Sequence, residues 1–370
     1  MRQKSLKIII SGGGTGGHIF PAIAIADALK SADDTVQILF IGAKGRMEME
    51  KVPQAGYAIR GLNITGFQRK WAFSNLIFPF RLIFSLFEAG YILRSFRPDV
   101  VVGVGGYASG PTLKAAVWLK IPCLIQEQNS YPGITNRLLG SKVNTVCVAY
   151  DRMEHWFPTE KIVLTGNPVR KESVDIAGKK EEAMRFFGLE KTQPVVLVIG
   201  GSQGALAINR AIIDNLDLFT GNNTQFIWQT GKEFYVRAKQ ALETAGLTNR
   251  IKAHPFIERM DYAYASADLI ISRAGAIAIA EISIVSKPVI LVPLPTAAED
   301  HQTSNALRLV EAGAAVLVPN SEAGPKLLPT ALILIQQPEK LHSMASAIEP
   351  FGRPEATHLI VEELIKIAKP

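Results

Sequence analysis

Cysteine is scarce in this sequence: only Cys123 and Cys147 occur among 370 residues, each within an apolar run. Two isolated thiols provide no disulfide framework, so the sequence excludes a disulfide-rich secreted domain and favours a reducing compartment. Hydrophobic residues make up 48% of the chain and charged residues 20%, values close to the soluble globular average. These proportions exclude disordered, collagen-like and multi-spanning membrane proteins.

A long apolar run is also missing near the start of the chain. Ile8-Ile9-Ile10 follows basic residues but meets Ser11-Gly12-Gly13 at once. A secretory signal needs an apolar region of about 7–15 residues, so we expect no export signal. We interpret the run as a first β-strand that enters a glycine turn.

Motifs for metals and for common cofactors are absent as well. The sequence has no Cys-x-x-Cys or His-Glu-x-x-His motif, its 6 histidines are scattered, and no Walker A lysine follows a glycine turn. No Asp-x-Asp pair is present to hold a divalent ion against a diphosphate. We therefore expect no metal and no organic cofactor. Basic side chains and helix dipoles would have to stabilise a diphosphate leaving group.

The chain does contain a modest excess of positive charge. Its 40 basic and 33 acidic residues give a net charge of +7. An excess of this size suits an anionic ligand, an anionic membrane surface or a nucleic acid, and it does not choose among them.

Short apolar runs alternate with amphipathic stretches along the whole chain. Continuous Val, Ile and Leu runs without in–out alternation indicate strands that are buried on both faces of a parallel sheet, and alternating strands and helices indicate a doubly wound α/β architecture. The predicted strands are Leu6–Ile10, Val36–Ile41, Val100–Val104, Cys123–Gln126, Val143–Val148, Val195–Ile199, Gln225–Gln229, Leu269–Ser272, Val289–Val292 and Ala315–Val318. The predicted helices are Ile19–Leu29, Leu206–Leu216, Thr303–Glu311 and Pro354–Ala368.

The two halves of the chain begin in the same way. Ile8–Gly14 is an apolar strand followed by a glycine turn, and Val198–Gly204 repeats this order. Two such starts predict two Rossmann-like domains, residues 1–165 and 166–347, with a boundary near Gly166–Arg170. The remaining residues, 348–370, are predicted to form a C-terminal helical segment.

The first glycine turn, Gly12-x-Gly14-x-x-Gly17, matches the dinucleotide fingerprint between a strand and a helix. Glycines let the backbone approach a phosphate at a helix N-terminus. A nicotinamide enzyme also needs an acidic residue after the second strand to hold the ribose, but here that strand ends Phe40–Lys44 without a carboxylate. Nicotinamide chemistry is therefore disfavoured, and a tight turn with only a packing role is an alternative.

The second glycine turn, Gly200-x-Ser202-x-Gly204, also fits the nucleophile elbow of α/β-hydrolases. Asp268 and His301 follow it in the order that a hydrolase triad requires. An α/β-hydrolase has one sheet, however, whereas this chain starts two. The same loop can serve a phosphate through its N–H groups and the Ser202 hydroxyl, and we prefer that interpretation.

Six motifs follow one another along the chain: Gly13–His18 with Pro21, Gly105–Pro111, Glu127–Asn129, Gly166–Arg170, Gly200–Ala205, and Gly275-Ala276 leading to Glu281. In this order they resemble the MurG family of bacterial N-acetylglucosaminyltransferases, and the similarity covers nearly the whole chain. The resemblance implies the GT-B fold, in which two Rossmann-like domains face a cleft. It implies that the first domain receives the acceptor and faces the membrane, that the second binds UDP-GlcNAc, and that the last helix packs back on the first.

The activity that the resemblance implies is an inverting transfer. GlcNAc moves from UDP-GlcNAc to the C4 hydroxyl of MurNAc in lipid I, which gives lipid II for peptidoglycan synthesis. The resemblance also implies an anionic membrane surface as partner, no nucleic acid, and a peripheral position on the cytoplasmic face of the plasma membrane; other cell-wall enzymes are further candidate partners. The alternative from another functional class is a non-catalytic protein that binds a nucleotide sugar.

For the nucleoside and sugar of the donor, the resemblance assigns three residues. Glu281 would bind the two ribose hydroxyls, the backbone of Ile257 would contact the uracil edge, and Gln302 would hydrogen-bond sugar hydroxyls. Glu281 lies early in a predicted helix, so complementing the helix dipole is an alternative role.

For the diphosphate, the resemblance assigns Ser202, Arg170 and the start of a helix at Ala276 and Ile277, whose dipole suits phosphates. A surface or interdomain ion pair is the alternative role for Arg170.

On the acceptor side, the resemblance assigns six residues: Thr15, Gly16, Gly17, His18, Glu127 and Asn129. His18 is the candidate general base for the incoming hydroxyl. Glu127 is the alternative base or orients the base, and a third alternative is that His18 only caps the glycine loop.

The sequence departs from the family at two positions. Gln126 stands where the family usually has a histidine before the Glu-Gln-Asn motif, which puts more weight on His18. Ala274 in Arg273–Ala276 stands where the family has a serine, so one hydroxyl near the phosphates is missing.

Residues 71–87 are unusually rich in aromatic and aliphatic side chains. A membrane-spanning helix needs about 20 apolar residues, and Pro79 and Arg81 interrupt this run. Basic residues flank it on both sides, as in a helix that lies in a membrane interface. We therefore predict an interfacial helix, with a core helix of the first domain as the alternative.

Overall fold

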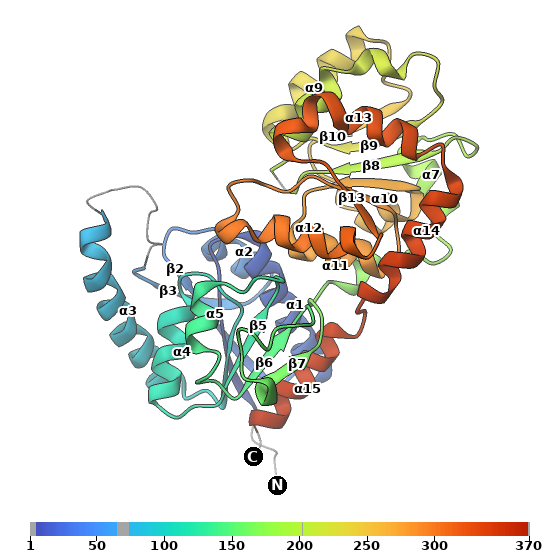
Figure 1. Ribbon diagram of the computed structural model, residues 1–370. Coiled ribbons are helices and arrows are strands. Elements are labelled where there is room, and N and C mark those ends of the chain that lie inside the picture. Colours follow the sequence, from blue (N-terminus) through green and yellow to red (C-terminus); the bar gives the residue numbers. More distant parts are fainter. Residues whose placement is uncertain (1–4, 65–73, 202, 369–370) are drawn as a thin grey trace. The chain divides into compact units, whose positions relative to one another are not determined.

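The computed structural model describes residues 5–64, 74–201 and 203–368. The chain divides into two compact units, Met1–Val169 with Glu355–Pro370, and Arg170–Pro354. Each unit is built on one parallel sheet with helices on both faces, so both are Rossmann-like α/β domains (Figure 1).

The first unit holds a seven-stranded sheet in the order β3-β2-β1-β4-β5-β6-β7. Its strands are β1 Lys7–Ser11, β2 Gln37–Ala43, β3 Ala58–Leu62, β4 Val100–Gly103, β5 Cys123–Glu127, β6 Thr145–Val148 and β7 Ile162–Leu164. Its helices are α1 Gly16–Ala32, α2 Glu48–Gln54, α3 Ser74–Phe96, α4 Ser109–Trp118, α5 Ile134–Leu139 and α15 Ala356–Ala368.

The second unit holds a six-stranded sheet in the order β10-β9-β8-β11-β12-β13. Its strands are β8 Val195–Ile199, β9 Gln225–Gln229, β10 Ile251–His254, β11 Leu269–Ser272, β12 Val289–Leu291 and β13 Ala315–Leu317. Its helices are α6 Lys171–Val174, α7 Lys180–Phe187, α8 Leu206–Ile213, α9 Lys232–Thr244, α10 Met260–Ser266, α11 Ala276–Ile284, α12 His301–Glu311, α13 Ala323–Leu334 and α14 Pro338–Ile348.

The two sheets share one topology. The first strand of each unit, β1 or β8, has the second strand of that unit on one side and a later strand, β4 or β11, on the other. Doubly wound sheets bind ligands beyond the carboxyl ends of their strands at this crossover. The two glycine turns leave β1 and β8 at that edge, so each lies where such a fold binds ligands.

The ten predicted strands are all present, and β8, β9 and β11 have the predicted bounds. The apolar-run pattern does not indicate three further strands, β3, β7 and β10, and each of these lies at an edge of its sheet. An edge strand is covered less completely, and in β3 exposed positions alternate with half-buried ones until the buried Leu62. β3 and β10 therefore lack the continuous apolar run that marks a central strand, whereas β7 is apolar but only 3 residues long.

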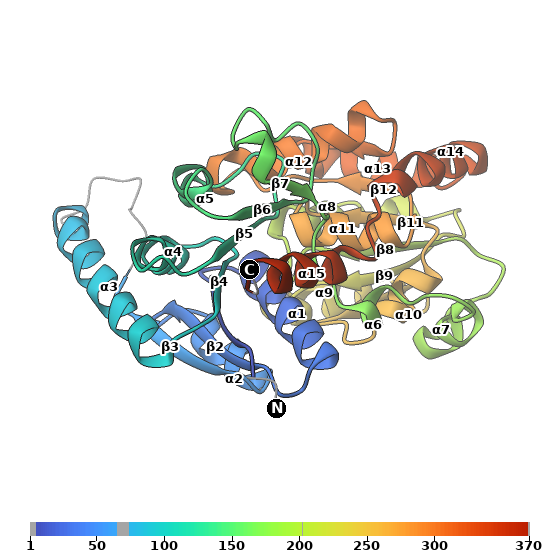
Figure 2. The same ribbon diagram turned by 90° about the horizontal axis from the view of Figure 1, so that it is seen from below.

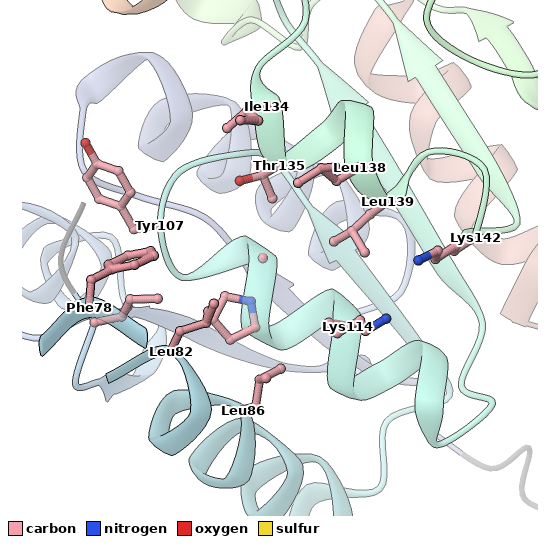
Figure 3. A pocket seen from close by; sticks show the side chains of 13 residues that line it. Phe78, Leu82, Leu86, Tyr107, Lys114, Ile134, Thr135, Leu138, Leu139 and Lys142 are labelled. Atoms are coloured by element: carbon pink, nitrogen blue, oxygen red, sulfur yellow. The ribbon is translucent and has the colours of Figure 1, made fainter. Parts of the chain in front are cut away.

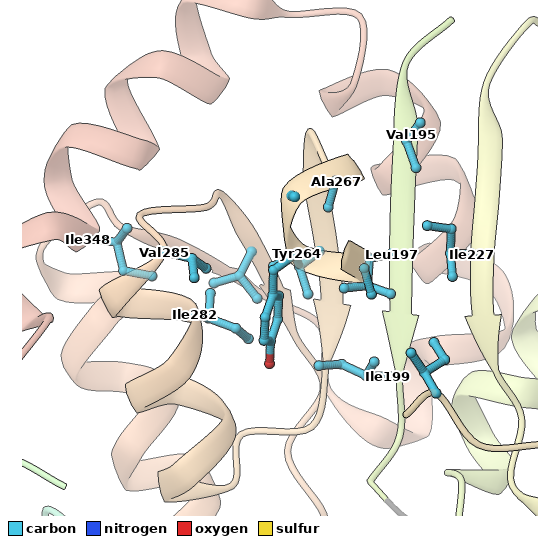
Figure 4. Close-up of a cluster of buried hydrophobic side chains, with 14 of the residues drawn as sticks. Val195, Leu197, Ile199, Ile227, Tyr264, Ala267, Ile282, Val285 and Ile348 are labelled. Atoms are coloured by element: carbon cyan, nitrogen blue, oxygen red, sulfur yellow. The ribbon is translucent and has the colours of Figure 1, made fainter. Parts of the chain in front are cut away.

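Successive residues of a central strand pack into different cores. Val195, Leu197 and Ile199 of β8 join the cluster on one face of the sheet (Figure 4), whereas Val196 and Val198 join the cluster on the other face. Residues of β1 alternate between two clusters in the same way. Because both faces are buried, Ile8–Ile10 of β1 and every position of β8 are apolar.

The last helix, α15, belongs to the first unit although the whole second unit precedes it in sequence. It lies beside α1 in both views (Figures 1 and 2), and Ile360, Val361 and Leu364 are buried in the same cluster as residues of β1. The chain passes between the units after Val169 and after Pro354, and residues 349–351 form a 3-10 turn of the second unit.

Candidate active site

Three segments meet at the carboxyl edge of the first sheet. A Cβ on Gly106, in the loop after β4, would lie 2.2 Å from the carbonyl oxygen of Gly13, in the turn after β1. Gly106 also has φ +85°, a conformation that favours glycine. The side chain of Gln128, after β5, donates a hydrogen bond of 2.9 Å to the carbonyl of Val104. These contacts bring together the loops after β1, β4 and β5, and each of these loops carries one of the sequence motifs.

His18 lies on the first turn of α1, half-buried, over these loops. Its Nδ1 is 3.1 Å from the carbonyl oxygen of Gly13 and 3.3 Å from the hydroxyl oxygen of Thr15. A carbonyl oxygen only accepts hydrogen bonds, so we assign the proton of the neutral ring to Nδ1. Nε2 then carries the lone pair, and a Cβ on Gly105 would lie 2.9 Å from it.

Thr15, Gly16 and Gly17 form the start of α1. The carbonyl of Thr15 accepts the N–H groups of His18 and Ile19, and Gly16 is the first helical residue. The first N–H groups of a helix have no acceptor within it and favour negative charge. This start therefore offers an anion-binding backbone beside the imidazole.

Glu127, at the end of β5, is 1% exposed. Its Oε1 accepts the N–H and the side-chain amide of Asn129, and its Oε2 accepts the N–H of Gly133 and the side-chain amide of Asn136. Burial raises the pKa of Glu127, and the four hydrogen bonds oppose that rise. The carboxyl group thus holds its own loop together and fixes both the backbone and the side chain of Asn129.

Gln126 forms part of a buried amide network. Its side chain donates to Oδ1 of Asn167 at 3.0 Å and accepts from the side chain of Gln128. Asn167 in turn donates to the carbonyl of Gln128 at 2.9 Å. The family's histidine position is thus occupied here by a side chain that connects two motifs.

In the second unit, Gln229 supports the glycine turn after β8. Its side-chain nitrogen donates to the carbonyl of Gly201 at 2.9 Å, and its side-chain oxygen accepts the N–H of Ile257 at 2.8 Å. A Cβ on Gly204 would lie 2.0 Å from the carbonyl oxygen of Thr230, so the turn packs directly on the loop after β9. Ser202 lies outside the described residues.

Glu281, on α11, accepts a hydrogen bond of 3.0 Å from the hydroxyl of Tyr264 on α10. Figure 4 shows the ring of Tyr264 within the apolar core. Its hydroxyl points in the direction of strand β8, from Val195 to Ile199, and so toward the ligand-binding edge of the sheet. Burial raises the pKa of Glu281, while the hydrogen bond from Tyr264 and the positive charge of Arg170 oppose the rise. Burial and the neighbouring Glu281 raise the pKa of Tyr264.

The other donor-side residues lie on elements of the same unit. Arg170 is exposed and immediately precedes α6, and its charge acts on Glu281. Ala276 and Ile277 are the first two residues of α11, which Gly275 caps with open space where a Cβ would stand. The side-chain oxygen of Gln302 accepts the N–H of Leu294 at 2.9 Å.

Arg273 has a structural role in the second unit. Its guanidinium donates to the carbonyls of Val292 and Pro293 and to the side chain of Asn320, at 2.7–3.1 Å. Burial lowers its pKa. Ala274, at the family's serine position, is fully buried.

Asp268 lies at the wrong edge of the sheet for a hydrolase triad. It directly precedes β11, and its carboxylate accepts the N–H of Val195, the first residue of β8, at 3.0 Å. The Gly200–Gly204 turn follows the other end of β8. The geometry therefore excludes the triad that the sequence allowed.

Two of these supporting side chains, Gln229 and Tyr264, are missing from the sequence-based assignment. Gln229 had a usable signal, because a polar residue that ends a buried strand of a parallel sheet lies at the ligand-binding edge. No sequence signal marks Tyr264, because its ring is buried in the core and its partner Glu281 is not a sequence neighbour.

An apolar groove of about 700 Å³ lies in the first unit between α3, α4 and α5. Figure 3 shows Tyr107 and Phe78 toward one end of it and Lys114 and Lys142 toward the other. Partial burial and the charge of Lys142 lower the pKa of Lys114.

Helix α3 carries a stripe of exposed apolar side chains beside this groove. Its members lie three or four residues apart on one face and are 53–74% exposed: Phe80, Ile83, Phe84, Phe87 and Tyr91. Residues 71–73 of the apolar segment lie outside the described residues. Within the described part of the chain, no helix is long and apolar enough to span a membrane.

No cluster of three or more potential metal ligands from His, Cys, Asp and Glu occurs among residues 5–64, 74–201 and 203–368. The geometry offers an imidazole held by its Nδ1 in one unit and a carboxylate paired with a buried tyrosine in the other.

Comparison with known proteins assigns the family. Residues 8–148 match the Glycosyltransferase family 28 N-terminal domain, and residues 195–360 match its C-terminal domain. A UDP-N-acetylglucosamine–N-acetylmuramyl-(pentapeptide) pyrophosphoryl-undecaprenol N-acetylglucosamine transferase from Bacteroides fragilis is 50% identical, covering 99% of this chain and 96% of the relative. The enzyme of that name from Porphyromonas gingivalis is 51% identical over 98% of this chain and 96% of the relative.

A solved structure agrees with these relatives. The crystal structure of Acinetobacter baumannii MurG superposes with a TM-score of 0.79 at 30% identity, covering 98% of this chain and 99% of that one. Its likeness and the two family 28 domains assign the GT-B fold to the pair of Rossmann-like units. The chain therefore belongs to the MurG family of glycosyltransferases, the UDP-GlcNAc-dependent N-acetylglucosaminyltransferases of family 28.

Proposed function

We propose that this chain transfers GlcNAc from UDP-GlcNAc to the C4 hydroxyl of MurNAc in lipid I, with His18 as the general base, and so forms lipid II for peptidoglycan synthesis. The observation that carries the mechanism is the hydrogen bond between Nδ1 of His18 and the carbonyl of Gly13. It leaves Nε2 as the basic nitrogen at the ligand-binding edge of the first sheet.

The proposed reaction is one in-line displacement at the anomeric carbon of GlcNAc. Nε2 of His18 takes the proton of the C4 hydroxyl as that oxygen attacks. The new C–O bond forms on the face opposite the leaving group, so the configuration inverts to a β1→4 link. The bond between the anomeric carbon and the diphosphate breaks, and UDP leaves with the electron pair.

Glu127 suits a positioning role better than the role of base. Its carboxyl group is buried and accepts four hydrogen bonds from its own loop, so proton uptake would cost contacts that hold that loop. We propose that Glu127 fixes the loop that presents Asn129 to the acceptor. Thr15, Gly16 and Gly17 complete the acceptor side.

The second unit supplies the proposed donor contacts. Glu281 accepts both ribose hydroxyls, and its hydrogen bond to Tyr264 supports an orientation fixed before the ligand binds. The N–H of Ile257 is engaged by Gln229, so we propose that the carbonyl of Ile257 meets the N–H of the uracil. Gln302 contacts sugar hydroxyls through its side-chain nitrogen, since its oxygen accepts from Leu294.

The diphosphate requires positive charge and N–H donors. Arg170 and the N-terminus of α11 at Ala276 and Ile277 are the proposed sources, together with the hydroxyl of Ser202. The charge of Arg170 acts on Glu281, which supports placing Arg170 near the nucleotide.

Acceptor-dependent release of UDP tests the proposal. The chain is incubated with UDP-GlcNAc and a short-chain lipid I analogue, and both UDP and the disaccharide product are quantified. We expect equal amounts of the two and little UDP without the acceptor. Binding of UDP-GlcNAc without any transfer would instead identify a nucleotide-sugar-binding protein.

We further propose that the first unit docks on an anionic membrane at the cytoplasmic face of the plasma membrane. The exposed stripe of α3 provides an apolar face of the kind that marks membrane or protein contacts. Lys114 and Lys142 at the neighbouring groove add cations that suit anionic headgroups. A lipid-anchored acceptor would be presented at such a surface.

A further inference from the structure

Glu48 is a buried acidic residue that the proposed mechanism does not use. It is the first residue of α2, it lies between the end of β2 and the first glycine turn, and it is 1% exposed. Its Oε1 accepts the N–H of Ala43 at 2.9 Å, and its Oε2 accepts the N–H of Gly14 at 2.9 Å. A buried carboxylate with both oxygens on backbone donors is costly to place, so its location against this turn requires an explanation.

The N–H of Gly14 and the carbonyl of Gly13 belong to the same peptide group. That carbonyl accepts the hydrogen bond from Nδ1 of His18 at 3.1 Å. One peptide group therefore lies between two side chains, with the Glu48 carboxylate on its N–H and the His18 imidazole on its oxygen.

We propose that Glu48 is a positioning residue for His18 and acts through the Gly13–Gly14 peptide. The inference rests on the proposed role of His18 as the base. Glu48 fixes the plane of this peptide, and the peptide oxygen fixes the ring orientation and keeps the proton of the neutral ring on Nδ1. A carboxylate bound directly to a catalytic imidazole performs the same task in serine proteases, and here one peptide group connects the two.

The surrounding backbone leaves this peptide little freedom. A Cβ on Gly13 would lie 2.2 Å from Oε1 of Glu48, and a Cβ on Gly106 would lie 2.2 Å from the oxygen of Gly13. Gly13 itself has φ +148°, which other residues rarely adopt. The two glycines thus permit the close approach of the carboxylate on one side and of the loop after β4 on the other.

The electrostatic effect has the sign that a base requires. Hydrogen bonds in a chain polarise one another, so a negative charge at the N–H end increases the negative partial charge on the peptide oxygen. That oxygen then stabilises the positive ring that forms when Nε2 takes the proton. The effect adds to the fixed orientation and needs no movement during the reaction.

Glu48→Gln tests the proposal, because glutamine keeps the size but offers one accepting oxygen for two N–H groups. We expect kcat to fall about 10- to 100-fold, the range typical when a group that orients another is lost. The KM for UDP-GlcNAc and the Kd for UDP should stay within about twofold, because the proposed donor contacts lie in the other unit. Glu50→Gln, at an exposed position of the same helix, is the matched control and should behave like the parent chain.

A spectroscopic measurement separates positioning from support of the fold. In protein labelled with ¹⁵N-histidine, the His18 signals, identified with His18→Ala, should show a protonated Nδ1 and an unprotonated Nε2 in the parent chain. In Glu48→Gln the tautomer population should shift toward the Nε2–H form. A variant with the parent's kcat and the parent's tautomer would overturn the proposal.

The parent chain alone keeps the inference testable if Glu48→Gln fails to fold. A predominant Nε2–H tautomer of His18 in the parent chain would refute it. If the parent chain binds UDP but transfers no GlcNAc, the proposed function fails, whereas the tautomer still reports on the connection between Glu48 and His18.

Discussion

The hydroxyl of Tyr264 donates a hydrogen bond of 3.0 Å to Oε2 of Glu281, which connects the apolar core of the second unit to its proposed ribose-binding carboxylate. The ring of Tyr264 is fully buried, so the donor cannot turn away from its partner without disturbing the core. Such a bond holds the carboxylate in one orientation before the nucleotide arrives, which lowers the entropic cost of binding.

This relationship predicts how UDP binding depends on pH. Burial raises the pKa of Glu281 above its ordinary value of 4.5, and only the ionised carboxylate accepts both ribose hydroxyls. UDP affinity should therefore weaken as the pH falls toward 4.5, beginning above that value. Calorimetric titration of UDP at several pH values measures the effect. Glu281→Gln should bind UDP weakly, with a loss of roughly 2–4 kcal/mol, and should retain only the pH dependence of the ligand itself.

Tyr264→Phe serves as the companion variant to that titration. The hydrogen bond from Tyr264 lowers the pKa of Glu281, so its removal should move the loss of UDP affinity to higher pH. Tyr262→Phe, on the same helix, should leave the profile unchanged. An identical profile for Tyr264→Phe and the parent chain would show that the contact does not tune the carboxylate.

His18→Ala should lower kcat by about 10²–10⁴, the usual contribution of a general base. UDP binding should persist, because the proposed donor contacts do not include this side chain. Initial rates with the lipid I analogue, together with a UDP titration, measure both quantities. Full activity of the variant would remove His18 from proton transfer and return that role to Glu127.

Glu127→Gln should act mainly on stability. One amide oxygen replaces a carboxylate that now accepts four hydrogen bonds, so buried donors lose their partners at a cost of roughly 1–3 kcal/mol. Thermal unfolding should begin at a lower temperature, with kcat per folded molecule reduced less than in His18→Ala. The opposite pattern, an unchanged melting profile with kcat abolished, would indicate that Glu127 is the base.

Gly106→Ala should disrupt the contact between the loop after β1 and the loop after β4. Its Cβ would lie 2.2 Å from the carbonyl oxygen of Gly13, and its φ of +85° is strained for alanine. We expect a loss of stability of about 2–5 kcal/mol, the sum of a backbone term and an overpacking term. Gly45→Ala is the matched control, because Gly45 has φ +72° and open space around the added carbon. Equal losses in chemical denaturation would argue against the close loop contact.

Replacing Phe80, Phe84 and Phe87 by serine should weaken binding to anionic vesicles at least tenfold, or about 1.4 kcal/mol. The three rings are 59–74% exposed, so the fold should tolerate the change. Turnover on a short-chain soluble acceptor should be nearly unaffected, and vesicle binding of the parent chain should decrease as salt rises. Val236→Ser with Ile333→Ser, two exposed positions of the second unit, is the control. Unfolding of the triple variant, or binding of the variant to vesicles with the affinity of the parent chain, would contradict the proposal.

Much of the fold follows from local sequence patterns. Ile8–Ile10 and Val195–Ile199 are apolar at every position because both faces of each central strand are buried, and this signal needs no knowledge of the partners. Glycines at the strand ends also predict tight turns from sequence alone, because a turn in which backbone packs on backbone has no room for a Cβ. The edge strands β3 and β10 carry no such signal, since incomplete burial relaxes the demand for apolar residues, and β7 is an apolar run of only 3 residues.

The sequence motifs also supply the candidate residues of the site, but they do not determine the role of each residue. The sequence favours His18 as the base and leaves Glu127 as the alternative. In the structure, Nδ1 of His18 contacts the carbonyl of Gly13, whereas the buried Glu127 carboxyl accepts four hydrogen bonds from its own loop, and these contacts support our proposal for the two roles. Periodicity and spacing report which residues are buried and where the chain turns. They do not report hydrogen-bond partners such as Gly14 and Glu48, which are 34 residues apart and meet only when β1, β2 and α2 pack together. The tertiary structure therefore decided the hydrogen-bond partners of the imidazole and the environment of each carboxylate, because these depend on contacts that form only in the packed chain.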